Sequence, residues 1–451
     1  MSRFLSVPRV LLGAIAGIFF AACIGPPPAA AATTVRSLGR IEAPGPVPSL
    51  AGTQLRMAGA IDRTHVVLHF DRALKQAPAD DPANFDIPGL AVLSAQREGF
   101  VSWSTATRVV LEVEEMEDVL YEVTATGMEG RFGTPMDPDH SSFEFRGFDD
   151  RTTRYTRFRM LGDSVGYGMW PILTDPAYTI FNLATVLIGA RQEGTGLPPL
   201  DAVNLSVPGY TSIQVLEGSM WDAIEANPDV IIVEIGGNDF GVVDFDRFQD
   251  NLYTIYSTLT TELPHVQVVG ADIYDAVLNA FPFGGDGRTV EEWVDAVHEI
   301  AALFEVPVVD IYRPFKGHTE PGGWYLSVDG LHPNAPGHAL AASSGLEVIR
   351  RLPHRPAAPV IREAGPGWAV VDTWVWDGDA VTEFFRFELD GEDLVEAATD
   401  EMPLRINGLA PGMAHVVRVR SIVPESEDGP QVASGWSDPL EFWSLDRARV
   451  E

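Results

Sequence analysis

Four short segments of the sequence carry side chains that could do chemistry. They are Gly162-Asp163-Ser164-Val165-Gly166, Asn204-Leu205-Ser206-Val207-Pro208-Gly209-Tyr210, Gly236-Gly237-Asn238-Asp239 and Asp329-Gly330-Leu331-His332-Pro333. A serine hydroxyl becomes a nucleophile beside a general base, and an imidazole held by a carboxylate is such a base. Asp329 lies three positions before His332, so it can turn back and hold one ring nitrogen protonated. The residue types together suit acyl transfer.

Each segment also has an ordinary structural interpretation. Ser164 could cap a helix, and the Gly-Gly-Asn-Asp run could be simple turn chemistry. The glycine of Pro208-Gly209 could serve a turn, or let backbone N–H groups approach a ligand. Only the combination is informative, because one region supplies a nucleophile, a base, an orienting acid and donors for a developing oxyanion, such as the Asn238 amide.

The elements that must position these residues alternate between strands and helices over residues 151–352. We expect strands at 157–161, 202–205, 230–235, 266–270 and 306–311, with helices at 212–226, 246–263 and 290–304. Strands such as Val230-Ile231-Ile232-Val233 are apolar throughout, which is typical of a parallel sheet covered by helices on both faces. This pattern predicts a doubly wound, flavodoxin-like domain whose functional residues follow the carboxyl ends of the strands.

The four ordered segments resemble the blocks of the SGNH (GDSL-type) hydrolases. The resemblance covers about 200 residues and implies a three-layer α/β/α domain with no cofactor. It implies that Ser164 is the nucleophile, His332 the base and Asp329 the orienting acid. The implied oxyanion hole combines the N–H groups of Ser164 and Gly209 with the Asn238 side chain. Val165 replaces the leucine of the older motif name, and Pro208 makes the second block stiffer.

One rival fold has the same local signature. The run from Gly162 to Gly166 also fits the Gly-x-Ser-x-Gly elbow of α/β-hydrolases. Ser164 follows the first strand of its domain, however, and Asp329 and His332 share one loop, which argues against that fold. His338 is the nearest competitor of His332 but resembles a helix start. No Cys/His cluster or paired-His motif suggests a metal.

Two regions of short, strand-like segments flank this domain. Residues 49–148 resemble bacterial Ig-like domains, and residues 355–445 resemble a fibronectin type III module, so we expect two β-sandwiches. His415 replaces the tyrosine usual in the second family. Five of ten tryptophans lie in that region, where we expect core packing, with a carbohydrate-stacking platform as the alternative. They are Trp368, Trp374, Trp376, Trp436 and Trp443.

The first 32 residues resemble an export signal, followed by a linker at residues 33–48. Arg3 and Arg9 precede an apolar run from Val10 to Ile24, which is short for a membrane span. Phe20-Ala21-Ala22-Cys23 resembles a lipobox, which would lipidate Cys23 and anchor the protein. The alternatives are cleavage within Ala29–Ala32, which removes the cysteine, and a retained membrane anchor. We therefore expect an exported bacterial protein, extracellular, periplasmic or attached to the cell surface.

The charge balance limits the partners. The chain has 64 Asp and Glu against 31 Lys and Arg, a net charge of −33. This excess repels phosphate backbones and anionic lipid headgroups, so we expect no nucleic-acid partner. A membrane partner is expected only through a lipid anchor. The oligomeric state stays open.

These observations predict a secreted or surface-anchored serine esterase that acts on small esters or acylated glycans. The apolar run at residues 276–283 either lines an acyl pocket, which favours a lipase or lysophospholipase, or packs a long loop. The alternative from another class is a non-catalytic surface binding protein with a degenerate hydrolase scaffold.

Overall fold

The structure is a computed structural model. It describes residues 52–98, 107–117, 119–147, 155–169, 179–190, 199–281, 287–349, 351–353, 355–375, 382–424 and 431–445. The expected export signal, the linker and Cys23 lie outside these residues. Within them, no helix is both long enough and apolar enough to cross a bilayer.

The central region is built on a five-stranded parallel sheet with the order β12-β11-β10-β8-β9. Counted along the chain, this is the 2-1-3-4-5 order of flavodoxin-like folds, so the predicted α/β class is confirmed. The strands lie within a few residues of their predicted positions. They are β8 (Arg157–Gly162), β9 (Asp201–Asn204), β10 (Val230–Glu234), β11 (Gln267–Ala271) and β12 (Val308–Val309).

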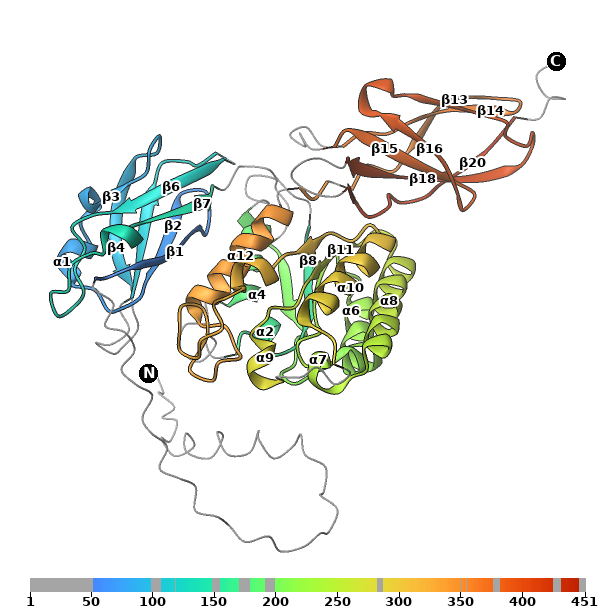
Figure 1. The fold of residues 1–451 in the computed structure, drawn as a ribbon. Coiled ribbons are helices and arrows are strands. Elements are labelled where there is room, and N and C mark those ends of the chain that lie inside the picture. The colour runs from blue at the N-terminus through green and yellow to red at the C-terminus, as the bar shows by residue number, and fades with distance from the viewer. Residues whose placement is uncertain are drawn as a thin grey trace, which may run out of the picture. The chain divides into compact units, whose positions relative to one another are not determined.

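Side chains on the sheet alternate between two apolar layers. Phe158, Met160 and Ile232 belong to one buried cluster, and Leu161 and Val233 belong to the other. The first layer includes helices α4 (Ile180–Ala190) and α12 (Ala335–Ile349), and the second includes α6 (Met220–Ala226), α8 (Phe245–Glu262) and α10 (Val290–Leu303). The ribbon shows helices on both faces of the sheet (Figure 1), so the domain has three layers.

Two helices match the predicted ranges closely, namely α8 and α10, whereas the third is broken. The predicted helix at 212–226 consists of α5 (Ser212–Gln214), a π-helical segment (Val215–Ser219) and α6. Short helices sit at several strand ends and loops. They are α2 (Ser164–Tyr167), α7 (Asp239–Val242), α9 (Val277–Ala280) and α11 (Tyr312–Phe315).

Strand β12 is shorter than its apolar run predicts. Pro307 has no N–H to donate, and the N–H groups of Ile311 and Tyr312 donate to the Asp272 carboxylate at 2.7 and 3.0 Å. Pro307 therefore contributes only its carbonyl oxygen to the ladder, which accepts the Gly270 N–H at 2.8 Å, and beyond the strand Asp272 holds the backbone of Ile311 and Tyr312.

The N-terminal region contains two antiparallel sheets, β1-β2-β5-β4 and β3-β6-β7. Antiparallel sheets are consistent with the expected sandwich, but the Ig-like assignment stays a prediction. The elements are β1 (Leu55–Ala60), β2 (His65–Phe70), α1 (Gln76–Ala79), η1 (Pro82–Asn84), β3 (Phe85–Asp86), β4 (Val92–Glu98), β5 (Arg108–Val113), β6 (Leu120–Ala125), η2 (Pro138–His140) and β7 (Ser142–Arg146).

This N-terminal region shares its core with the α/β domain. Met57 of β1 and Ala339 of α12 belong to the same buried cluster. The buried Tyr325 hydroxyl donates to the Arg56 carbonyl oxygen at 2.9 Å, and the Arg56 guanidinium lies 3.5 Å from the ring centre of Trp324. Strand β1 is therefore packed directly against the segment that leads into α12.

The C-terminal region also forms antiparallel sheets, β13-β14-β17 and β16-β15-β18-β19 with β20 beside β18, around its own core. The fibronectin-like assignment stays a prediction. The elements are β13 (Val360–Gly365), β14 (Trp368–Asp372), β15 (Phe384–Leu389), β16 (Glu392–Ala398), η5 (Thr399–Glu401), β17 (Leu404–Asn407), β18 (Ala414–Val423), β19 (Val432–Ala433) and β20 (Leu440–Trp443).

The described tryptophans of this region are not part of its buried core, contrary to the prediction. Trp374 and Trp443 are 50% and 69% exposed. Phe442 points inward on β20, so the next residue points outward, as strand alternation requires. The core is filled instead by residues such as Phe387 and Val419. Trp376 lies outside the described residues.

Candidate active site

Ser164 lies where strand β8 ends and helix α2 begins. The Asp163 carboxylate caps this helix by accepting the Val165 N–H at 2.9 Å. Ser164 is 7% exposed. The capped turn holds the serine hydroxyl at the carboxyl edge of the sheet, where ligands bind in such folds.

His332 lies in the loop before α12, 168 residues further along the chain. Its Nε2 is 2.9 Å from Ser164 Oγ, and its Nδ1 is 2.7 Å from Asp329 Oδ2. The other oxygen of Asp329 accepts the N–H groups of Leu331 and His332 at 3.0 and 3.1 Å. Gly330 adopts a φ of 69°, which lets the backbone turn back so that Asp329 reaches His332. The structure therefore brings Ser164, His332 and Asp329 into one hydrogen-bonded chain.

This chain of contacts is competent for acid–base chemistry. A carboxylate on Nδ1 leaves Nε2 free to accept a proton from the serine hydroxyl. Both distances are within hydrogen-bond reach, which is the first requirement of a nucleophile and its base.

Gly209 and Asn238 follow β9 and β10. Gly209 has a φ of 84°. In the described part of the chain, neither the Ser164 N–H nor the Gly209 N–H donates to a protein acceptor. Both backbone donors are thus available to a ligand.

The Asn238 side chain is already engaged. Its Nδ2 lies 2.9 Å from the Tyr210 carbonyl oxygen and 3.2 Å from Asp163 Oδ2. A primary amide nitrogen carries two N–H groups, so both are used in this structure. An oxyanion at this point must compete with Asp163 for the second N–H.

Two buried acids beneath the serine were not predicted from the sequence. Glu234 Oε2 accepts the Gly166 N–H at 2.9 Å, and Glu234 is 3% exposed. Burial raises the pKa of Asp163 to about 7 and raises the pKa of Glu234 well above its usual value. The signal in the sequence is a charged residue that ends an otherwise apolar strand, just before Gly236.

Two further residues hold the histidine loop and were also missed. The Tyr274 hydroxyl donates to the Leu331 carbonyl oxygen at 2.6 Å. Asn279 Nδ2 donates to the carbonyl oxygens of Gly330 and Thr319 at 2.5 and 2.7 Å. No spacing rule connects these positions, since they meet only when the loop after β11 reaches the loop before α12.

His338, the competing histidine, has a structural environment. It is fully buried in the first turn of α12, and its Nδ1 accepts the Ile180 N–H at 3.2 Å. Burial lowers the pKa of His338 to about 3, so it stays neutral. It supports the contact between α12 and α4 rather than contacting Ser164.

The apolar run at 276–283 divides between two environments. Ala276 and Val277 are buried in the core, whereas Leu278 is 42% exposed. The run therefore does not act as one apolar surface, and residues 282–283 lie outside the described residues.

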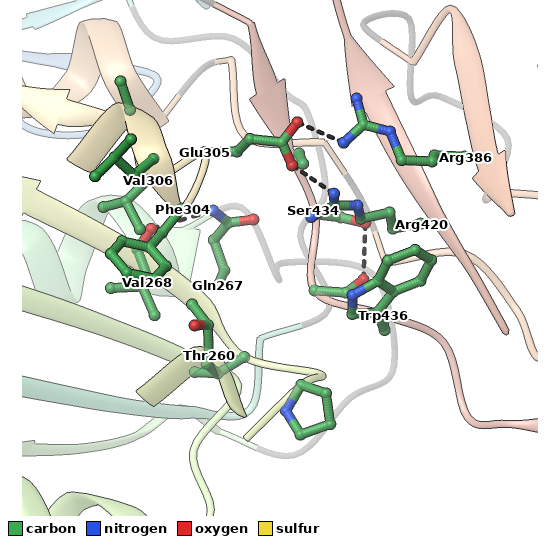
Figure 2. Close-up of a pocket in the computed structure, with 16 residues that line it drawn as sticks. Thr260, Gln267, Val268, Phe304, Glu305, Val306, Arg386, Arg420, Ser434 and Trp436 are labelled. Atoms are coloured by element: carbon green, nitrogen blue, oxygen red, sulfur yellow. Dashed lines mark hydrogen bonds and ion pairs between the residues drawn. The ribbon is translucent and has the colours of Figure 1, made fainter. Parts of the chain in front are cut away.

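A cavity of about 520 Å³ is lined by residues such as Thr260, Glu305 and Trp436 (Figure 2). Glu305 pairs there with Arg386 and Arg420, both at 2.5 Å, and Trp436 lies beside them. None of the triad residues lines it. Among the described residues, no group of three or more His, Cys, Asp or Glu could hold a metal ion.

A family model matches the region of the chain that contains this site. Residues 160–340 match the model of the GDSL-like Lipase/Acylhydrolase family. The matched region contains the five residues predicted for the triad and the oxyanion hole, from Ser164 to His332, but not Cys23. The match supports a GDSL-like lipase/acylhydrolase domain in this region and an enzyme that hydrolyses ester bonds. The chain matches none of the curated proteins.

Several solved structures are similar to part of the chain. The psychrotrophic esterase EstA from a Pseudoalteromonas species is 16% identical, with 43% of this chain and 97% of that chain covered and a TM-score of 0.34. A lipase/acylhydrolase from Enterococcus faecalis is 21% identical, with 43% and 94% covered and a TM-score of 0.34. An acetyl xylan esterase is 14% identical, with 43% and 99% covered and the same TM-score.

Proposed function

We propose that this ester-bond hydrolase cleaves carboxylic esters through an acyl-enzyme formed on Ser164. The observation that carries the proposal is the contact of Ser164 Oγ with His332 Nε2 at 2.9 Å, continued to Asp329 at 2.7 Å. The hydroxyl proton passes to His332 as the serine attacks the ester carbonyl. The same imidazolium then protonates the leaving alcohol. Water repeats the sequence on the acyl-enzyme and releases the acid, so no cofactor is needed.

The oxyanion formed in each half-reaction is stabilised by the N–H groups of Ser164 and Gly209 and by the Asn238 amide. Two facts support this assignment: the backbone donors have no protein acceptor in the described residues, and the Asn238 bond to Asp163 is its longer one. Preorganised donors of this kind need no reorientation during the reaction.

The experiment is hydrolysis of a short p-nitrophenyl ester by the wild type and by Ser164→Ala. We expect activity in the wild type and near-complete loss in the variant. Ser257→Ala, on the half-buried flank of α8, is the matched control and should keep wild-type activity. Activity that survives Ser164→Ala would contradict the triad assignment. A folded but inactive wild type would favour a non-catalytic binding protein.

Short acyl or glycan O-acetyl esters are the proposed substrates, with a lipase or lysophospholipase activity as the second candidate. The exposed indoles of Trp374 and Trp443 favour the glycan, because they offer flat apolar faces to a sugar ring. Hydrolysis rates on acetylated xylan and on p-nitrophenyl acetate distinguish an enzyme that prefers glycan esters from one that acts on any short ester. Replacing both tryptophans by alanine should raise KM for the polymer and leave the small ester unchanged. Preference for long acyl chains would favour the lipase.

Export to the cell surface or beyond is proposed from the sequence of residues 1–32, which resembles a signal with Cys23 at a lipobox. Radiolabelled palmitate incorporation, compared with Cys23→Ala, tests lipidation. The flanking regions are proposed as an Ig-like and a fibronectin type III-like sandwich, which their antiparallel sheets support.

A further inference from the structure

The buried acids Asp163 and Glu234 meet directly beneath the proposed nucleophile. Both side chains are withdrawn from water, with exposed fractions of only 2% and 3%, and Glu234 reaches the backbone of Asp163. Glu234 Oε2 also accepts the Gly166 N–H at 2.9 Å and lies 3.5 Å from the Asp163 N–H. Glu234 thus contacts the helix α2 turn from below, at two points on either side of Ser164.

Two neighbouring carboxyl groups that are buried away from water repel each other when both are ionised. A hydrogen bond between them requires a proton on one, because ionised carboxylates only accept. The other titratable groups that act on the pair are Asp239 on Asp163 and the Tyr274 hydroxyl, which senses both acids. These groups are acids too. Among the described residues, no cation is recorded acting on the pair, so neutralisation by a proton remains.

The proton belongs on Glu234. Donors reach both oxygens of Asp163, since the Val165 N–H binds Oδ1 and Asn238 Nδ2 binds Oδ2, whereas both backbone N–H groups at Glu234 meet the same oxygen, Oε2. Donors that point at a carboxylate favour its charged form. Burial and the neighbouring charge of Asp163 raise the pKa of Glu234 well above its usual value.

We propose that Glu234 is a positioning residue that acts as a neutral carboxylic acid, donating its proton to Asp163 and so fixing the nucleophile turn and Asn238 together. Asp163 caps helix α2 and holds the Asn238 amide, so its position sets both the serine and the proposed oxyanion donor. Glu234 fixes Asp163 from the far side and does not contact the reacting atoms. The proposal rests on the proposed function of Ser164.

Two substitutions of Glu234 test whether its side chain acts as a neutral hydrogen-bond donor or must be charged. Glu234→Gln keeps an N–H for Asp163 and an oxygen for the Gly166 N–H, so kcat should stay within about threefold of the wild type. Glu234→Ala removes both, so kcat should fall by at least about tenfold with KM little changed. Glu291→Gln, an exposed acid paired with Tyr312 and Lys316, is the matched control and should leave kcat unchanged.

Two measurements do not depend on activity. The infrared spectrum at neutral pH should contain a carboxylic-acid C=O band that shifts in D₂O and disappears in Glu234→Gln but not in Glu291→Gln. The wild type should also lose unfolding free energy as pH rises above the ordinary range of Glu, because the folded state holds this proton more tightly. Glu234→Gln should lack that part of the slope.

The outcomes are distinct. A Glu234→Gln enzyme as impaired as Glu234→Ala, or an acid band that persists in Glu234→Gln, would overturn the neutral-acid proposal. If Glu234→Ala does not unfold but keeps full kcat, the positioning role is wrong. A wild type that has the acid band but hydrolyses no ester would refute the proposed function and leave the shared proton standing.

Discussion

The Tyr274 hydroxyl donates a 2.6 Å hydrogen bond to the carbonyl oxygen of Leu331, the residue directly before His332. Tyr274 is buried and follows β11, whereas Leu331 lies in the loop before α12. One hydroxyl therefore joins the sheet edge to the loop that carries His332.

Tyr274→Phe should lower kcat about fivefold with little change in KM, because one neutral hydrogen bond contributes about 1 kcal/mol and this one positions the His332 loop. Steady-state kinetics on a p-nitrophenyl ester measure the effect. Tyr253→Phe is the control, since that tyrosine is 49% exposed on α8 and its ring lies edge-to-face against Phe304. Equal kcat values for Tyr274→Phe and wild type would show that the loop holds its position without this bond.

Gly166→Ala should destabilise the fold by about 1–3 kcal/mol and reduce kcat, because the new methyl group overpacks the site beneath the serine. It would lie 2.6 Å from Ser206 Oγ and 3.1 Å from Glu234 Oε2. Gly218→Ala is the control. Its methyl group meets nothing within 4 Å on a helical segment, so it should gain about 0.5–1 kcal/mol. Urea unfolding of the two variants tests the contrast, and similar shifts in both would contradict it.

Asn238→Ala should lower kcat by about 100- to 1,000-fold and change KM far less, as expected for a donor that acts mainly on the oxyanion. Its thermal unfolding must be measured in parallel, because the side chain also donates to the Tyr210 carbonyl oxygen. Asn407→Ala, on the exposed face of β17, is the control. An unchanged kcat would remove Asn238 from the oxyanion hole.

Asp239 predicts a pH dependence of stability with a defined sign. Burial raises the pKa of Asp239 to about 6, even though the Ser212 N–H and hydroxyl donate to its carboxylate. The folded state therefore binds this proton more tightly than the unfolded chain does. Its contribution to the unfolding free energy falls as pH rises from about 4 to about 6, by at most about 3 kcal/mol, and is then constant.

The measurement is the difference in unfolding free energy between wild type and Asp239→Asn at several pH values. The unfolding free energy of the wild type should fall relative to that of Asp239→Asn as the pH rises from 4 to 6. The comparison with Glu291→Gln should give the opposite sign, since a hydrogen bond from Tyr312 lowers the pKa of Glu291. The unfolding free energy of the wild type should rise relative to that of Glu291→Gln as Glu291 ionises. The same sign in both variants would contradict the assignment.

Much of the α/β domain could be predicted because its information is local. Strand β10 is a continuous apolar run, and Thr289 and Glu292 form the capping box that starts α10. The ends of such elements are marked by their own residues. The contacts among Ser164, His332 and Asp329 could also be predicted from local motifs, since Asp329 and His332 lie three positions apart and the structure links them to Ser164.

The supporting residues could not be predicted, because their partners are distant in sequence. Glu234 contacts Gly166, and Tyr274 contacts Leu331, only after the parallel strands align. Glutamate is rarely fully buried, so a pattern of apolar residues does not predict that Glu234 lies in the interior. The prediction of core packing was wrong for Trp374 and Trp443, because large aromatic residues usually indicate a core but these two are exposed.

The hydrogen bond from Tyr325 to the Arg56 carbonyl oxygen has a consequence for how this protein can change. Tyr325 lies seven positions before His332, and the apolar layer of α12 continues into β1. A chain that lacked residues 1–150 would expose that layer to water. The loop that carries His332 would also lose the hydrogen bond between Tyr325 and Arg56. The N-terminal sheets are therefore not a detachable attachment that could be exchanged between enzymes. Substitutions in β1 and α12 must instead be accepted as matched pairs, so these two segments should evolve together.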